Sequence, residues 1–384
     1  YAVPFNETLY IFSESTQFRL ASDTALSPKN VALVDVTNFD SSPKCRPVVA
    51  GKNLYFPVER AEYTSIREYY NVESVSDIKN AQDISAHVPS YIPNGVYQLL
   101  SQNNENILFI LTEGQNQSIF VYKYLFVDEN RVQAAWSKWD LQGRILGAFF
   151  ADSSFFVVIN RGGKHILEKM NFTYFTKDLE GQEVYRTYLD TKKVATTGTF
   201  DELTNLTSYD ILKEWSFANT SGIEAVGVVT DEGKYFEIPE DDFKNNKVSI
   251  RGDYSKRKVI IGIPYVFKVS LSPLYIRATD NSGGSKVLTN GRLQIRDIRF
   301  NYADTGGFTV CVKTHNHTYK YTMTSKVLGH TVLGNNDFVS GTFRVPVQSL
   351  NTNYEAWIES KLPLPLSLIG YIWYGNFIAR TKGV

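Results

Sequence analysis

Apolar and polar positions over about the first 170 residues fall into four copies of one short pattern. In each copy, an apolar or aromatic run is followed by a polar turn and then by a segment in which apolar and polar residues alternate. The runs begin at positions 9, 54, 108 and 155, so they are spaced 45, 54 and 47 residues apart. Repeats of about 40–50 residues that contain only strands are typical of propeller blades. The pattern therefore predicts β-propeller-like blades over residues 1–171.

One stretch inside this region, residues 72–95, breaks the strand pattern. Ser76 and Asp77 offer side-chain oxygens that can cap a short helix. Further on, Pro89 and Pro93 favour extended backbone, and the Asn-Gly pair at 94–95 favours a turn. We therefore predict an inserted helix and a rigid loop between the second and third blades.

The next region, residues 172–285, is more polar but still contains strand-like segments at 226–229 and 258–261. Residues 231–234 (DEGK) predict a hairpin turn. A Gly- and Ser-rich linker, residues 281–285, closes the region. We predict a small β-rich region here, either a knob or an insertion.

Residues 286–384 alternate cleanly between apolar and polar positions, most clearly over 292–300 (RLQIRDIRF). This alternation places polar side chains on one face of a strand and apolar ones on the other. We predict a C-terminal β-sandwich-like domain. With 24 Tyr and 24 Phe among 384 residues, the composition also favours strands. The predicted fold class is all-β: propeller-like blades, then the small β-rich region, then the sandwich.

The formal net charge is zero, but the charge is unevenly distributed. Residues 1–171 and residues 172–285 each carry a net charge of −3, whereas residues 286–384 carry +6. Zero overall charge argues against tight, salt-dependent binding of nucleic acid. The basic last segment leaves weaker contact with phosphate or a membrane surface open.

The two cysteines, Cys45 and Cys311, lie far apart in the sequence and are expected to be isolated thiols. The longest apolar stretch, residues 362–374, is too short for a membrane helix and is broken by Pro363 and Pro365. A buried terminal strand is predicted there. Because the chain begins with Tyr1, we expect it to be part of a longer polypeptide.

Several residue groups raise the possibility of a site, and each has a simpler explanation. His315 and His317 have a spacing that suits a metal, but they lack a convincing third ligand, for which His330 is the only nearby candidate. A turn between two strands is the favoured interpretation. Asp77, Asp83 and His87 would form an acid–base cluster, but Asp77 and Asp83 do not share a helix face.

The tripeptide at 251–253 (Arg-Gly-Asp) matches an integrin-binding motif, and an ordinary turn explains it equally well. Six glycosylation sequons would matter only in a secreted chain: Asn6, Asn116, Asn171, Asn205, Asn219 and Asn316.

No established catalytic motif occurs in the chain. The Asp box of propeller glycosidases is absent, and its nearest counterpart, residues 304–308 (DTGGF), lacks the leading Ser. We therefore predict no enzyme activity and assign no catalytic, cofactor-binding or metal-binding residue. The sequence does not identify residues that bind nucleic acid.

Five segments of the chain resemble the tail tubular protein B family, which forms the nozzle of short-tailed, podovirus-type bacteriophages. They are residues 1–5 (YAVPF), 76–95 (SDIKNAQDISAHVPSYIPNG), 136–140 (WSKWD), 291–296 (GRLQIR) and 369–376 (IGYIWYGN). The polar region 172–285 matches the family least well. Family members are about twice as long, so the resemblance assigns this chain to their C-terminal half.

The resemblance implies a structural role at the tail tip of the virion. Six copies would form a ring, below the tail adaptor (tail tubular protein A) and near the tail fibres. Double-stranded DNA would pass through the lumen without sequence-specific binding, and contact with the host outer membrane is possible. Two alternatives remain open: a propeller-type glycan hydrolase, or a carbohydrate- or receptor-binding adhesion module.

Overall fold

The computed structural model consists of β-strands and a few short helical turns. The structure describes residues 1–6, 8–21, 30–70, 81–127, 130–172, 186–211, 223–231, 233–243, 246–279, 284–288, 290–315, 317–325 and 338–379. Its named elements are 31 strands and three short 3₁₀ helices, and every strand pairing is antiparallel. The all-β prediction is confirmed. The chain divides into two compact units, Tyr1–Thr173 and Tyr174–Val384.

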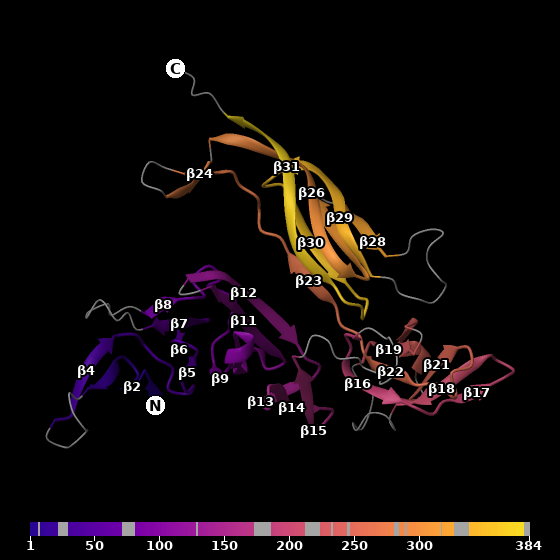
Figure 1. The fold of residues 1–384 in the computed structure, drawn as a ribbon, viewed down its shortest axis with the longest axis horizontal. Coiled ribbons are helices and arrows are strands. Elements are labelled where there is room, and N and C mark those ends of the chain that lie inside the picture. The colour runs from indigo at the N-terminus through magenta and orange to yellow at the C-terminus, as the bar shows by residue number, and fades with distance from the viewer. Residues whose placement is uncertain are drawn as a thin grey trace. The chain divides into compact units, whose positions relative to one another are not determined.

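The first unit contains four consecutive sheets, each built from strands that are neighbours in sequence (Figure 1). Sheet 1 is β1 (Ala2–Phe5), β2 (Thr8–Phe12), β3 (Gln17–Ala21) and β4 (Ala32–Thr37). Sheet 2 is β5 (Val48–Ala50), β6 (Asn53–Glu59), β7 (Thr64–Tyr70) and β8 (Ala81–Asp83). Sheet 3 is β9 (Val96–Gln102), β10 (Ile107–Thr112), β11 (Ser118–Val127) and β12 (Asn130–Asp140). Sheet 4 is β13 (Arg144–Ala151), β14 (Ser154–Arg161) and β15 (Lys164–Asn171).

The four sequence repeats correspond to these four sheets. The apolar runs lie in β2, β6, β10 and β14, which is the second strand of each sheet. The alternating segments lie in the next strands, β3, β7, β11 and β15, and each pairs with its apolar run. The repeat is therefore confirmed as a hairpin within each sheet. Closure of these sheets into a propeller stays a prediction.

The sheets pack on one another through their faces, so the two middle sheets are covered on both sides. In β6, Phe56 packs against Phe12 of sheet 1, with ring centroids 5.2 Å apart, whereas Tyr55 packs toward Tyr124 of sheet 3. In β10, Phe109 packs against Phe155 of sheet 4 at 4.6 Å. Successive side chains of a strand point to opposite faces. This arrangement explains why β6 and β10 are apolar runs without alternation.

The segment predicted as an inserted helix and loop is described only from residue 81 onward. Over residues 81–95 it forms β8 and a series of turns. Ile84 and Ile92 are buried in the core between sheets 2 and 3. Asn94 donates to the backbone carbonyls of Arg60 and Ala61. The loop is therefore held firmly in place, while the proposed helix cap at residues 76–77 lies outside the described residues.

The second unit begins with three small sheets. The first is β16 (Asp190–Ala195), β22 (Val259–Ile263), β19 (Ala225–Thr230) and β20 (Tyr235–Pro239). The second is β17 (Thr199–Asp201), β18 (Leu206–Asp210) and β21 (Lys247–Arg251), and the third is β24 (Arg277–Thr279) with β25 (Ser285–Val287). The strands predicted at 226–229 and 258–261 correspond to β19 and β22, and 231–234 joins the antiparallel pair β19–β20.

The rest of the second unit is a pair of sheets around one core. One sheet is β23 (Phe267–Ser270), β30 (Tyr354–Ser360), β27 (Gly307–Thr314) and β28 (His317–Thr324). The other is β29 (Val339–Leu350), β26 (Gly291–Thr305) and β31 (Ser367–Ala379). Phe300 and Ile298 of β26 share the core with Val310 of β27. This is the arrangement of a β-sandwich. The three-part domain division itself stays a prediction.

We expect Phe109→Ala to destabilise the first unit by about 3–5 kcal/mol, because Phe109 is fully buried and its loss leaves a cavity between sheets 3 and 4. Urea unfolding measures this change. Leu167→Ala is the control in the same unit: Leu167 is 59 % exposed, and its truncation should change stability by less than about 0.5 kcal/mol. Equal effects of the two substitutions would contradict the packing described here.

Candidate functional site

A buried charged network joins sheets 2 and 3. Glu68 of β7 is almost fully buried, and its Oε1 accepts hydrogen bonds from Tyr55 Oη at 2.6 Å and Asn53 Nδ2 at 2.7 Å. Its other oxygen, Oε2, lies 2.6 Å from a guanidinium nitrogen of Arg131, which projects from β12 of sheet 3. A buried carboxylate is tolerated when it is paired and hydrogen-bonded in this way.

The groups around Glu68 hold fixed protonation states near neutral pH. Burial raises the pKa of both Tyr122 and Tyr124 to about 12. Burial and the neighbouring Glu68 charge also raise the pKa of Tyr55. Burial opposes the charge on Arg131, but the Glu68 carboxylate outweighs it and raises the Arg131 pKa. The tyrosines stay neutral and the arginine stays charged. The network is therefore suited to stabilising the packing of the two sheets rather than to proton transfer.

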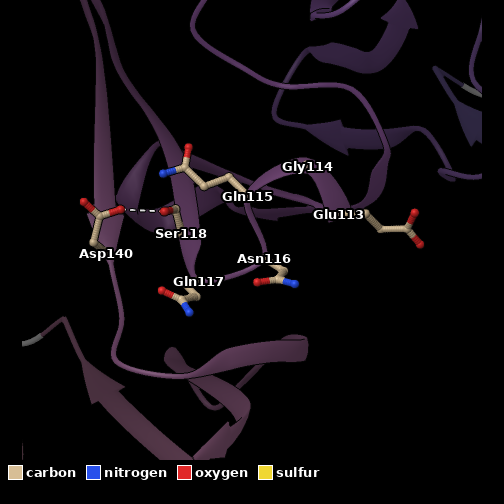
Figure 2. A pocket seen from close by; sticks show the side chains of 7 residues that line it. All are labelled: Glu113, Gly114, Gln115, Asn116, Gln117, Ser118 and Asp140. Atoms are coloured by element: carbon tan, nitrogen blue, oxygen red, sulfur yellow. Dashed lines mark hydrogen bonds between the residues drawn. The ribbon is translucent and has the colours of Figure 1, made fainter. Parts of the chain in front are cut away.

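A polar pocket of about 310 Å³ lies at the β10–β11 connection (Figure 2). It is lined by the short helix η2 (Glu113–Gln115), by residues 116–118 and by Asp140 at the end of β12. Thr112 begins the turn, since its side chain accepts a hydrogen bond from Gly114 N. The lining offers amides, a hydroxyl and two carboxylates.

The two carboxylates of this pocket do not converge. In Figure 2, Glu113 and Asp140 lie at opposite ends of the lining, and the Glu113 carboxylate points away from Asp140. Asp140 accepts a hydrogen bond from Ser118 and lies 3.3 Å from the Lys138 ammonium. Glycoside hydrolysis needs two carboxyl groups facing one bond from opposite sides. The pocket lacks that arrangement.

A second buried carboxylate lies on the outer face of the C-terminal sandwich. Asp297 of β26 is inaccessible to solvent because Arg299 and Arg344 cover it, with closest N–O distances of 3.3 and 3.1 Å. Burial alone would raise the Asp297 pKa, but hydrogen bonds from Arg344 and Arg299 outweigh it and lower the pKa. Arg299 also stacks on the ring of Tyr374 in β31. These contacts tie all three strands of the sheet together.

The histidine candidates for a metal site are not brought together. His315 has a positive φ of 49° and lies in the turn between β27 and β28, so it does not share a strand face with His317. His317 contacts the ring of Tyr319 instead. The turn prediction is confirmed, and His330 lies outside the described residues. Within the described ranges, no group of three or more His, Cys, Asp or Glu side chains is arranged to bind a metal.

Asp83 has a local structural role. It forms an ion pair with Arg60 at 2.7 Å and accepts hydrogen bonds from the backbone and hydroxyl of Ser85. His87 lies in the following turns, and no described contact joins it to Asp83. Asp77, the third member of the proposed cluster, lies outside the described residues.

The Arg-Gly-Asp tripeptide spans the end of β21, where Arg251 is the last strand residue and the chain bends at Gly252. Gly252 has a φ of +111°, and Asp253 accepts two hydrogen bonds from Ser255. The ordinary-turn interpretation is confirmed. Of the sequons, Asn116 lines the polar pocket and Asn171 accepts a hydrogen bond from Ser154, whereas Asn219 and Asn316 lie outside the described residues.

The remaining sequence expectations concern cysteines, the terminal strand and the Asp-box remnant. Both cysteines are buried free thiols, as predicted. The strand expected at the end of the chain is present, but the prediction that it is buried is wrong: most of β31 is exposed. Residues 304–308 span the short connection between β26 and β27, which lie in the two different sheets of the sandwich. In the described part of the chain, no helix is long and apolar enough to cross a membrane.

Sequence analysis missed the Glu68–Arg131 and Asp297 networks. Glu68 occupies an ordinary alternating strand, so nothing in its pattern distinguishes it from a solvent-facing carboxylate. The sequence around Asp297 gave a weak indication that this residue is buried. It lies beside Ile298, and both are buried at an irregularity in β26 that shifts the alternation.

The sequence profile of the bacteriophage nozzle protein family matches residues 1–384. The chain is also 34 % identical over 393 residues to the "Tail tubular protein gp12" of Escherichia phage T7. The chain belongs to the bacteriophage nozzle protein family. The match to the T7 protein covers 100 % of this chain and 49 % of that protein, so the chain spans about half the length of its relative. Family membership makes this nozzle protein a structural component of the phage tail, located in the virion tail.

Similarity to solved structures is weak. A structure of Kluyveromyces lactis Hsv2 aligns over 54 % of the nozzle protein and 66 % of its own chain, at 14 % identity and a TM-score of 0.28. A glycoside hydrolase aligns over 97 % and 96 % of the two chains, at 7 % identity and a TM-score of 0.15. These scores are too low to support an argument about fold or function.

The WSKWD motif, which carried part of the family resemblance, has a clear packing role in the nozzle protein. Trp136 packs toward sheet 2 and donates a hydrogen bond to the carbonyl of Ile84 at 3.1 Å. Trp139 packs on the opposite face of sheet 3, against Phe109. The motif thus connects sheet 3 to both of its neighbours.

We expect Arg131→Ala to cost about 3 kcal/mol of unfolding free energy, because it leaves the buried Glu68 carboxylate without its cation. Denaturant unfolding followed by Trp fluorescence measures this change. Lys123→Ala is the matched control, because its ion pair with Glu105 at 3.9 Å is exposed and should contribute less than about 1 kcal/mol. A cost for Arg131→Ala no larger than the control would show that the network does not stabilise the stack.

We expect acid to weaken the Asp297 cluster. Because the folded pKa of Asp297 is lowered, its stabilisation is complete above the unfolded value of about 3.9 and is lost as pH falls through the folded pKa. Asp297→Asn should therefore flatten the fall in stability below about pH 4, which urea midpoints from pH 6 to pH 2 would measure. Asp242→Asn, a change at an exposed carboxylate, is the control. An unchanged slope in Asp297→Asn would contradict the assignment.

Proposed function

We propose that six copies of the nozzle protein form a ring that encloses the path of the viral double-stranded DNA during ejection. The ring would attach to the tail adaptor, with tail fibres close to the junction. The observation that carries this proposal is the stack of sheets in the first unit, whose middle members are buried on both faces. Such a stack resists deformation, because close-packed interiors are stiff. A conduit wall needs that property.

The charge of the chain supports passage of DNA without tight binding. A net charge of zero gives little of the counterion release that drives strong association with nucleic acid. The arginines of the Asp297 cluster are partly neutralised by that carboxylate. DNA would therefore slide past the protein without sequence-specific contacts.

We also infer that the nozzle protein acts without catalysis. The polar pocket lacks converging carboxylates. Around Glu68, the pKa values of Tyr55 and Tyr122 are raised well above neutral pH, so these groups do not exchange protons there. These features support a shape-holding role over the glycan hydrolase alternative.

The outermost faces of the first unit suggest that more sheets belong to the stack. On sheet 1, Leu9, Leu20 and Leu33 lie side by side on the face opposite the core. On sheet 4, Phe149 lies beside Phe156 on the corresponding face, and Phe149 is exposed. Terminal members of a repeat array normally carry a polar outer face. We infer that further sheets of the full-length protein cover both ends and complete a propeller.

Electron microscopy of the full-length protein with its adaptor tests the ring. We expect particles with six-fold symmetry and a central channel, because family membership implies a tubular tail component. The adaptor alone and the nozzle protein alone are the controls. Particles with another symmetry, or without a channel, would rule out the proposed assembly.

A further inference from the structure

Strand β31 forms an open edge of the C-terminal sandwich (Figure 1). It pairs with β26 on one side, and among the described residues no strand pairs with its other side. The pairing shifts register twice, once where Ile369 is skipped on β31 and once where Arg296 is skipped on β26, and residues 370–379 of β31 are paired without a gap. An edge of this kind presents unpaired N–H and C=O groups that can accept another strand.

The edge of β31 lacks two of the features that normally prevent strand addition, namely charged residues and prolines. Its 13 residues, SLIGYIWYGNFIA, include neither a charged residue nor a proline. Other edge strands of seven or more described residues carry charges: β12, β13, β15, β28 and β29. β9 is also uncharged, but two of its side chains form hydrogen bonds with other strands. Gln98 bonds to Ala148 of β13, and Ser101 bonds to Val49 of β5. Proteins use edge charges and prolines to block unwanted pairing.

The side chains of β31 are apolar and accessible. Ile372 is 51 % exposed and Ile378 is 68 % exposed, and both lie on the face opposite the sandwich core. Tyr374 lies on the same face, where Arg299 stacks on its ring and fixes it. A long, apolar, uncharged edge would promote aggregation in a protein that worked as a free monomer.

We propose that β31 docks a β-strand of a second copy of the nozzle protein, so that neighbouring copies in the ring are joined by strand addition. The inference rests on the proposed ring and names one of its contacts. Charge supports a second copy as the occupant. The segment that contains β31 carries +6, while residues 1–171 and 172–285 carry −3 each. A head-to-tail contact between copies pairs the basic end of one with an acidic part of the next.

The chemistry of the edge defines what the partner strand must offer. Backbone hydrogen bonds supply the attachment, and side chains beside Ile372 and Tyr374 supply specificity through cross-strand pairs. Because β31 is uncharged, the partner strand itself should be apolar on the face beside Ile372. The opposite charges then lie around the strand pair rather than within it.

Full-length protein carrying Ile372→Lys tests the contact. A charged lysine on an edge strand prevents pairing with another strand. Ring formation by Ile372→Lys should therefore require about tenfold more protein, which corresponds to a loss of about 1.4 kcal/mol per contact. Mass photometry of the full-length protein with its adaptor, across a dilution series, measures this shift. Tyr319→Lys is the matched control, because Tyr319 is 46 % exposed on β28, an edge of the other sheet of the sandwich. It should assemble as the wild type does.

Amide hydrogen exchange on the unmodified protein gives a second measurement. Exchange over residues 370–379 should slow on ring assembly, relative to the dissociated protein, because the free N–H groups of β31 become paired. If Ile372→Lys folds with an unchanged melting temperature and assembles like the wild type, the contact is wrong although the ring stands. Equal exchange in both states would overturn it too. A wild type that forms no ring would instead refute the ring, and this contact with it.

Discussion

Burial of both faces of a sheet is the constraint on which the first unit depends. A sheet covered on one side can alternate polar and apolar residues, but sheets 2 and 3 must supply apolar side chains in both directions. β10 meets this demand with six consecutive buried residues. Phe109 and Ile110, neighbours in sequence, therefore serve two different cores. Register is fixed as a result, since a slip by one residue would exchange the two cores.

Glu68 places a buried carboxylate inside this apolar stack, and its oxygens are paired. Glu68 satisfies its oxygens with Tyr55, Asn53 and Arg131, and the guanidinium comes from the neighbouring sheet. A network of this kind favours one alignment of the two sheets, because any shift leaves a buried charge unpaired. In the C-terminal sandwich, Asp297 pairs with two arginines of its own sheet, Arg299 on β26 and Arg344 on β29, and so ties neighbouring strands together. Apolar packing thus holds the sheets together, while buried ionic contacts fix the alignment of two sheets at Glu68 and of strands within one sheet at Asp297.

Sequence patterns predicted the class of fold and the four hairpins because strand periodicity and apolar runs are local signals. They also predicted that turns connect the antiparallel pairs β19–β20 and β27–β28. The exposure of β31 was predicted wrongly, because an apolar run indicates burial without revealing whether the partner is in the same chain. Networks such as Glu68–Arg131, 63 residues apart, depend on which sheets become neighbours, and no local pattern encodes that. The absence of a catalytic motif was readable from the sequence, whereas the polar pocket was not.

The burial of the two thiols determines how they react with oxidants. Cys45 is fully buried, and burial raises its pKa to about 12, so almost no thiolate exists at any pH a virion meets. Cys311 is likewise inaccessible, and burial raises its pKa as well. Oxidation and disulfide exchange both require an exposed thiolate. Prolonged contact with air should therefore leave Cys45 and Cys311 as free thiols, without disulfide cross-links.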